Sequence, residues 1–254
     1  MGEREEPRAT WFGHSTVLIE QEGARILTDP VLRDRILHLR RHPEMRVGLE
    51  PGRLDAVLLS HHHFDHFDRP SLRSLDRETT VIGGPGTRAL LRREGFSRVI
   101  DLAPGERVDL ERIGIRATPA EHDGSRTPFH QEGEAVGFVV EGPRSVYFAG
   151  DTDLFDELGE VARGSALALL PVWGWGPSIG PGHLDPERAA EAVSLIAPDV
   201  AVPIHWGTFA PMGLQSRLAG GRQRPAELFA HFVSESTPQT AVRILRPGGS
   251  TTYS

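Results

Sequence analysis

Residues 56–68 read AVLLSHHHFDHFD, an apolar run that leads directly into a cluster of metal-ligating side chains. The apolar composition of Ala56–Ser60 predicts a β-strand. Alternate side chains at the end of a strand point the same way, so His61 and His63 can converge on one metal ion. The sequence therefore predicts a metal site at the end of this strand.

A second ion is within reach of the turn that follows the strand. Asp65 and His66 lie on that turn and can ligate a neighbouring ion, so that one segment serves two metals. His62 falls on the opposite face, and we interpret it as structural. The alternative is a surface histidine run without metal. Against it, four imidazoles and a carboxylate would repel one another or stay unsatisfied if they were buried without an ion.

The amino-acid composition limits the chemistry of the chain. It has 254 residues and no cysteine, which excludes disulfides, thiolate metal ligands and cysteine nucleophiles. The 28 basic residues are all arginine, so a lysine base or nucleophile is excluded. Any metal must be held by nitrogen and oxygen, which suits zinc and also manganese or iron. The net charge of −7 argues against an extended nucleic-acid interface, and we expect no nucleic-acid partner.

Apolar periodicity predicts strands and helices within one domain that spans residues 1–254. Further strands are predicted at Thr16–Glu20, Val136–Glu141, Ser145–Ala149 and Val200–Ile204. Helices are predicted at Thr87–Glu94, Pro186–Ile196 and Pro225–Ser234, the second with Asp185 as its N-cap. This element order favours sheets packed face to face with helices outside, although periodicity alone also allows a doubly wound sheet.

Two stretches are predicted to be surface loops. Arg33–Arg53 is rich in arginine and holds two prolines, and Pro171–His183 is too rich in glycine and proline for a helix or a central strand. Long loops in compact domains are often lids or binding loops. The arginines of the first stretch either face an anionic ligand or form a solvated, charged surface.

Three more candidate ligands occupy the same position relative to a strand. His122, Asp151 and His205 each follow a β-branched or aromatic run. Taken singly, each has an ordinary structural interpretation, such as a turn at Gly150–Asp151. Because strand ends from different parts of a sheet can meet at one edge, we expect these three side chains to complete the metal site.

The order HxHxDH, then His, then Asp, then His resembles the metallo-β-lactamase superfamily, from Trp11 to about Phe209. The resemblance implies an α/β fold, a four-layer αββα sandwich of metallo-β-lactamase type with two divalent ions at one edge. It also implies the ligands: His61, His63 and His122 for the first ion, Asp65, His66 and His205 for the second, and Asp151 as the bridge between them. Histidine at position 63 is typical of the dinuclear hydrolases, whereas oxygen-reducing diiron members have glutamate there.

Three further segments, WFGHSTVLIE, GHLDPERAAEA and IHWGTF, resemble a narrower branch of this superfamily. That branch contains the N-acyl-phosphatidylethanolamine-hydrolysing phospholipase D and the ascorbate-6-phosphate lactonase, and IHWGTF is closer to the phospholipase. By this resemblance His183 lines the pocket near the metals, and His14 and Asp29 support the ligands or are structural. A purely structural role is the alternative for His14 and for His183.

The resemblance implies a hydrolase in which a metal-bridging hydroxide attacks a phosphodiester or related ester of a small molecule. Asp65 would orient its ion and accept a proton from water, and His183 would stabilise the electrophile's oxygen or protonate the leaving group. Opening of a lactone or amide ring is the alternative reaction, and a metal-binding sensor without turnover is the alternative from another class. Candidates for apolar pocket walls, with core packing as the equal alternative, are Trp173, Trp175, Trp206 and Phe209.

The chain is expected to be a cytoplasmic protein. No apolar run approaches the length of a membrane-spanning helix, and the N-terminus MGEREEPRAT lacks an apolar signal core. The sequence also shows no basic amphipathic helix suited to a lipid surface. We therefore expect a small-molecule substrate and no membrane partner, and assembly into a homo-oligomer is left open.

Overall fold

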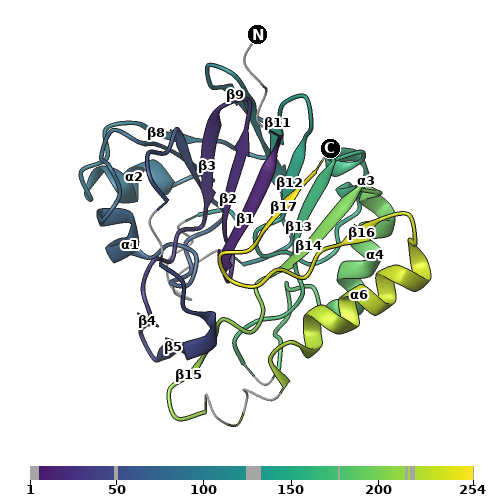
Figure 1. Ribbon diagram of the computed structural model, residues 1–254. Helices are drawn as coiled ribbons and strands as arrows, with labels where there is room; N and C mark the ends of the chain where they lie inside the picture. Colours follow the sequence, from purple (N-terminus) through teal and green to yellow (C-terminus); the bar gives the residue numbers. More distant parts are fainter. Residues whose placement is uncertain are drawn as a thin grey trace.

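The computed structural model describes residues 6–48, 51–123, 133–176, 178–214, 217 and 221–253. Two seven-stranded sheets pack face to face, and helices cover their outer faces (Figure 1). The predicted four-layer αββα sandwich is therefore confirmed. Among the helices within the described ranges, none is long and apolar enough to cross a membrane.

The two sheets are built in the same way. The first has the order β17-β1-β2-β3-β6-β7-β8 and the second the order β16-β14-β13-β12-β11-β10-β9. From β17 and from β9, three antiparallel pairings are followed by three parallel ones. The strands of the first sheet are β1 (Arg8–Gly13), β2 (Thr16–Gln21), β3 (Ala24–Thr28), β6 (Ala56–Leu59), β7 (Thr80–Gly83), β8 (Val99–Asp101) and β17 (Ser250–Thr252). Those of the second are β9 (Arg107–Asp109), β10 (Gly114–Pro119), β11 (Val136–Glu141), β12 (Val146–Phe148), β13 (Leu167–Pro171), β14 (Val200–Ile204) and β16 (Ala241–Val242).

Side-chain alternation explains why each sheet is covered on both faces. Along β2, Val17 and Ile19 belong to the main core, whereas Leu18 packs in an outer cluster with Leu72 and Leu91. The last two residues come from α1 (Arg69–Arg73) and α2 (Thr87–Arg92), which lie beside the first sheet (Figure 1). Strands buried on both faces read as continuous apolar runs, as β6 and β14 do.

The helices that cover the second sheet are α3 (Leu158–Ala162), α4 (Pro186–Ile196) and α6 (Arg224–Ser236) (Figure 1). The Asp185 side chain caps α4 as predicted, because it accepts a hydrogen bond from the backbone N–H of Arg188 at 2.9 Å. The helix ends at Ala197, which takes the left-handed conformation with a φ of 52°.

A third, smaller sheet corrects the prediction that Arg33–Arg53 is only a surface loop. It has the order β15-β5-β4, formed by β15 (Phe209–Pro211), β5 (Leu39–Arg41) and β4 (Arg35–Ile36), and the short helix η1 (Pro43–Met45) follows β5. This sheet forms because Ile36 and Leu39 bury their side chains with Val31 and Phe209, and Trp175 packs against them. The described residues of Pro171–His183 are irregular, as predicted, except for Pro171 at the end of β13.

Three arginines of the Arg33–Arg53 stretch pair with groups of the protein. Arg33 forms a two-pronged ion pair with Asp68, and Arg46 pairs with Asp34. Arg41 is buried and donates to backbone carbonyls. These three guanidinium groups therefore already have partners within the protein.

Candidate metal centre

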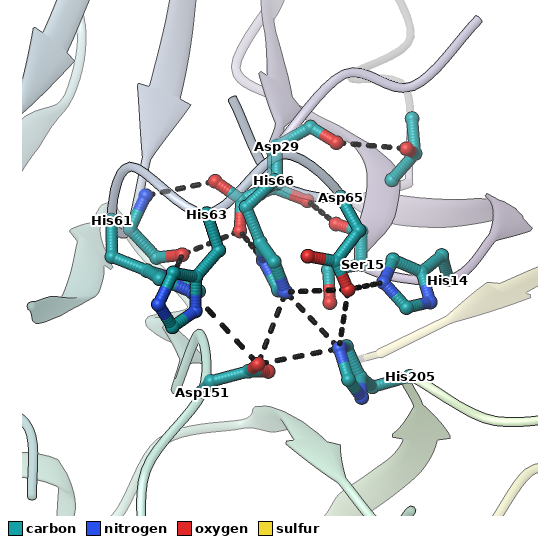
Figure 2. A network of polar contacts seen from close by, with 12 residues as sticks. His14, Ser15, Asp29, His61, His63, Asp65, His66, Asp151 and His205 are labelled. Atoms are coloured by element: carbon teal, nitrogen blue, oxygen red, sulfur yellow. Dashed lines mark hydrogen bonds and ion pairs between the residues drawn. The ribbon is translucent and has the colours of Figure 1, made fainter. Parts of the chain in front are cut away.

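The candidate ligands lie at one edge of the sandwich, where strands of both sheets end (Figure 2). His61 follows β6 of the first sheet, whereas His122, Asp151 and His205 follow β10, β12 and β14 of the second. The chain turns sharply at several of these strand ends. His205 has a φ of 61°, a left-handed value that is uncommon for a side chain other than glycine. Such strain clusters at functional sites, where the surrounding structure holds it in place.

The first ligand cluster contains His61, His63 and His122. His63 Nδ1 lies 3.0 Å from His61 Nε2 and 3.2 Å from His122 Nε2. The Nδ1 atom of His122 is 2.8 Å from the carbonyl oxygen of Gly182, to which it can only donate. Nε2 of His122 therefore carries a lone pair directed at the other two rings.

The second ligand cluster contains Asp65, His66 and His205, and His14 joins it. The Nε2 atoms of His66 and His205 are 3.0 Å apart. Nδ1 of His205 donates to the Trp173 carbonyl at 2.6 Å, which leaves its Nε2 lone pair facing the cluster. His14 Nε2 lies 2.9 Å from Asp65 Oδ2, so the structure places His14 against a candidate ligand, as the support role predicts.

Asp151 lies between the two clusters (Figure 2). Its Oδ2 atom is 3.1 Å from His66 Nε2 and 3.3 Å from His205 Nε2. The same oxygen is 3.9 Å from His61 Nε2 in the first cluster. Oδ1 of Asp151 is buried and has no hydrogen-bond partner among the described residues, an arrangement that is costly unless a further group satisfies it. Nitrogen lone pairs and a carboxylate oxygen that face one another at these distances fit the binding of cations.

The electrostatics of the centre also fit a cation. Burial raises the pKa of Asp151, but His205 and His66 outweigh that effect and hold it well below its usual range. Burial lowers the pKa of His66, but the carboxylates of Asp151 and Asp65 outweigh it and raise the pKa well above its usual range. Without metal, a proton on His66 therefore supplies positive charge that the carboxylates require.

Two histidines of the first cluster, His61 and His122, are held uncharged at neutral pH. Burial, followed by the charge of His66, lowers the pKa of His61 well below its usual range. Burial also lowers the pKa of His122 to about 4, against the opposing effect of Asp151. Metal ligation requires neutral imidazoles, so these histidines are ready to bind an ion without first losing a proton.

His183 lies on the open side of the centre. Its Nε2 atom is 3.5 Å from Asp151 Oδ2, and 23% of its side chain is exposed, compared with 3% for Asp151. Nδ1 donates to the Pro181 carbonyl at 3.0 Å. Burial lowers the pKa of His183, but the hydrogen bond to Asp151 outweighs it and raises the pKa. The structure thus brings His183 to the centre together with the seven candidate ligands.

Three other aromatic and histidine residues selected from the sequence are not among the candidate ligands, and each has its own packing or hydrogen-bond partner. Trp206 stacks on Trp11 at 5.0 Å and is buried, so it packs the core. The Phe209 ring packs edge-on against His14 at 5.3 Å. His62 Nε2 hydrogen-bonds the Thr87 hydroxyl on α2 at 2.9 Å, on the side away from the ligand clusters.

Ser60 is the residue at this centre that the sequence analysis missed. Its hydroxyl lies 2.5 Å from Asp29 Oδ2 and 3.0 Å from His61 Nδ1. Asp29 Oδ2 is also 2.6 Å from His66 Nδ1, so Asp29 supports a ligand as the resemblance implies. A hydroxyl placed immediately before the histidine cluster is the signal that would have identified Ser60.

Comparison with known proteins identifies the class. Residues 24–206 match the family model of a β-lactamase superfamily domain. The chain belongs to this superfamily and is a metal-dependent hydrolase of the metallo-β-lactamase type.

Individual relatives agree with this assignment. The chain is 32% identical over 244 residues to a metal-dependent hydrolase of Caldivirga maquilingensis, with 94% of each chain covered. It is 30% identical over 247 residues to N-acyl-phosphatidylethanolamine-hydrolyzing phospholipase D 1 of Caenorhabditis elegans, covering 87% of this chain and 69% of the relative. Among solved structures it resembles Igni18, a metallo hydrolase from Ignicoccus hospitalis, with 26% identity, a TM-score of 0.73 and 98% of each chain covered.

Proposed function

We propose that the protein holds two divalent metal ions, zinc in preference to manganese or iron, and hydrolyses a phosphodiester or related ester of a small molecule. The observation that carries this proposal is the position of Asp151. Its Oδ2 atom is within 3.9 Å of His61 in one cluster and within 3.3 Å of His66 and His205 in the other. A carboxylate shared by two sets of ligands is the arrangement that a pair of neighbouring ions needs.

The ligand sets follow from the two clusters. Bound there, divalent ions supply hydroxide from water at neutral pH and polarise the oxygen of the electrophile. The residues that would hold the ions are His61, His63 and His122 for the first, Asp65, His66 and His205 for the second, and Asp151 for both.

Asp65 is held ionised and in one orientation. Burial raises its pKa, but His66 and His14 outweigh that effect and keep it well below its usual range. The hydrogen bond to His14 Nε2 occupies Oδ2 from the side of β1. Asp65 can therefore ligate its ion and accept a proton through its remaining lone pairs.

His183 is the candidate for protonating the leaving group. Its raised pKa keeps a larger protonated fraction at neutral pH than an ordinary histidine has. Its Nδ1 is already bonded to Pro181, which leaves Nε2 at the open side of the centre as the atom that can donate. A positioned imidazolium in this place can act as a general acid.

The choice of a phosphodiester rests on a relative. The Caenorhabditis elegans protein, 30% identical, is named for the hydrolysis of N-acyl-phosphatidylethanolamine, which contains a phosphodiester. The same centre can act on a lactone or amide carbonyl, because both reactions place negative charge on an oxygen beside the ions. Turnover of model substrates therefore distinguishes a phosphodiester from a lactone or amide as the substrate.

The test compares metal-loaded, chelated and reloaded protein on bis-p-nitrophenyl phosphate and on a lactone panel. We expect phosphodiester turnover that disappears with chelator and returns with zinc or manganese. His63→Ala and Asp151→Ala should lose both activity and bound metal, because each removes a ligand. His231→Ala is the matched control, since His231 is an exposed histidine on α6.

Each other outcome selects a different function. Turnover of lactones alone would favour ring opening over phosphodiester cleavage. Stoichiometric metal without turnover of any substrate would favour a metal-binding sensor. Asp151→Ala protein that keeps its full metal content would contradict the bridging position and, with it, the two-ion centre.

A further inference from the structure

We propose that Asp29, acting through the Ser60 hydroxyl, sets which ring nitrogen carries the proton on one histidine of each candidate ion site. Both are positioning residues, because they contact the far sides of the ligand rings. The inference rests on the ligand assignment of the proposed function. Its first measurement uses the metal-free protein, so the two can fail separately.

Asp29 is a buried acceptor surrounded by donors. It follows β3 and has no exposed surface. Its Oδ1 accepts a hydrogen bond from the backbone N–H of Ser60 at 2.8 Å, and its Oδ2 faces both the Ser60 hydroxyl and His66 Nδ1. Burial raises the pKa of Asp29, and the three donors around its two oxygens oppose that effect by stabilising the carboxylate, which can only accept. His66 therefore keeps a hydrogen on Nδ1, and the proton that it loses when an ion binds is the one on Nε2, which faces Asp151.

The same argument places the proton of His61. A serine hydroxyl has one hydrogen, and here that hydrogen bonds Asp29 at an O–O distance of 2.5 Å. Towards His61 Nδ1, 3.0 Å away, the hydroxyl can only accept. His61 must then carry its hydrogen on Nδ1, which leaves the Nε2 lone pair facing His63 and Asp151. One carboxylate thereby orients a ligand in each cluster.

The turn at Gly150 keeps the hydroxyl in place. A Cβ atom at Gly150 would lie 2.5 Å from Ser60 Cβ and 3.0 Å from its Oγ, so this turn packs directly against the serine. The Ser60 carbonyl is also bonded, because it accepts from the backbone N–H of Val136 at 2.9 Å. Packing and backbone bonds on both sides therefore restrict the rotation of the hydroxyl.

Two substitutions separate proton placement from packing. Ser60→Ala removes the acceptor of the His61 hydrogen. Asp29→Asn keeps the shape but introduces amide hydrogens that can donate to Ser60 Oγ, which turns the hydroxyl towards His61 as a donor. Both changes favour the Nε2–H form of His61, whose Nε2 cannot bind an ion. Ser165→Ala is the matched control, because Ser165 is equally buried and its hydroxyl donates to the Ala162 carbonyl.

The first measurement is a long-range proton–nitrogen NMR spectrum of the histidine side chains in metal-free protein, with His61→Asn to assign the resonance. The second is zinc affinity by chelator competition. We expect the Nδ1–H form of His61 in the wild type and in Ser165→Ala. In Ser60→Ala and Asp29→Asn we expect the Nε2–H form and zinc affinity lower by about ten-fold or more.

The proposal is overturned if His61 keeps the Nδ1–H form in either relay variant, or if both variants bind zinc as tightly as Ser165→Ala does. Should Ser60→Ala fail to fold, the isosteric Asp29→Asn decides by the same spectrum. A wild type that shows the Nδ1–H form but binds no zinc would support this proton placement and count against the metal assignment alone.

Discussion

Arg41→Met should destabilise the protein by about 1 to 4 kcal/mol. Arg41 lies on β5 and is 1% exposed. Its Nη1 donates to the carbonyl oxygens of Phe12 at 3.0 Å and Met45 at 3.4 Å, and its Nη2 donates to Val31 at 2.8 Å. Methionine fills a similar volume but has no donor, so three carbonyls lose their partner. One of them belongs to β1, just before His14.

Two opposing effects set the magnitude. A hydrogen bond to a charged group contributes about 1.5 to 3 kcal/mol, so three of them together contribute about 4.5 to 9 kcal/mol. Burial of the cation lowers the pKa of Arg41 to about 10, a cost on the order of 3 kcal/mol that methionine would remove. The difference is about 1.5 to 6 kcal/mol, and water that reaches some of the freed carbonyls reduces it further, which leaves a net loss of about 1 to 4 kcal/mol.

The assay is urea unfolding of metal-free protein at pH 7. Arg40→Met is the matched control, because Arg40 is the exposed neighbour on the same strand and its loss should change stability by less than about 0.5 kcal/mol. If the two variants were equally stable, the cost of burying the charge would cancel its hydrogen bonds, and the reasoning would be refuted.

Three further predictions concern pH and the turn before Asp151. Zinc uptake at pH 7 should release protons, because burial lowers the pKa of His66 but the carboxylates outweigh it and raise the pKa well above its usual range, so His66 must lose a proton to bind the ion. Calorimetry in buffers of different ionisation enthalpy measures the release, and binding without proton release would contradict the prediction. Metal-free protein should lose stability as the pH falls from about 6.5 towards 4, because burial lowers the folded pKa of His122 to about 4 and the unfolded chain takes up the proton first. His66 changes little in that window, because it is protonated there in both the folded and the unfolded chain. A higher urea midpoint at pH 5 than at pH 6 would reverse the expected sign. Gly150→Ala should lower the free energy of unfolding, measured by thermal unfolding, by about 1 to 3 kcal/mol more than Gly164→Ala. Both glycines have left-handed φ values, but only the methyl group at position 150 would press against Ser60. Equal losses of stability would mean that φ alone sets the cost.

Continuous apolar runs and clear helix signals were sufficient to predict several elements. β11, β14 and α4 have the predicted bounds, because Val200–Ile204 is buried along its whole length and Asp185 caps its helix. Arg33–Arg53 was predicted wrongly because arginine density usually indicates a surface. Arg41 can be buried because carbonyl groups of β1, η1 and the segment after β3 accept its hydrogen bonds. No local pattern in the sequence predicts this set of partners.

In the candidate site, too, some residues could be predicted from the sequence and others could not. The ligand-type residues could be selected from the sequence because each follows a strand and because their order resembles a known superfamily. The contacts that support them could not, since they join distant parts of the chain. Ser60 meets Asp29 across 31 positions, and His14 meets Asp65 across 51. A single hydroxyl or imidazole carries no periodicity from which such a contact could be read.

The most direct test of the two-ion centre is zinc-edge anomalous diffraction from crystals of zinc-loaded protein. We expect two zinc peaks in each chain, one on each side of the Asp151 carboxylate. A single peak, or a pair of peaks that does not share Asp151, would contradict the bridging position on which the proposed function depends.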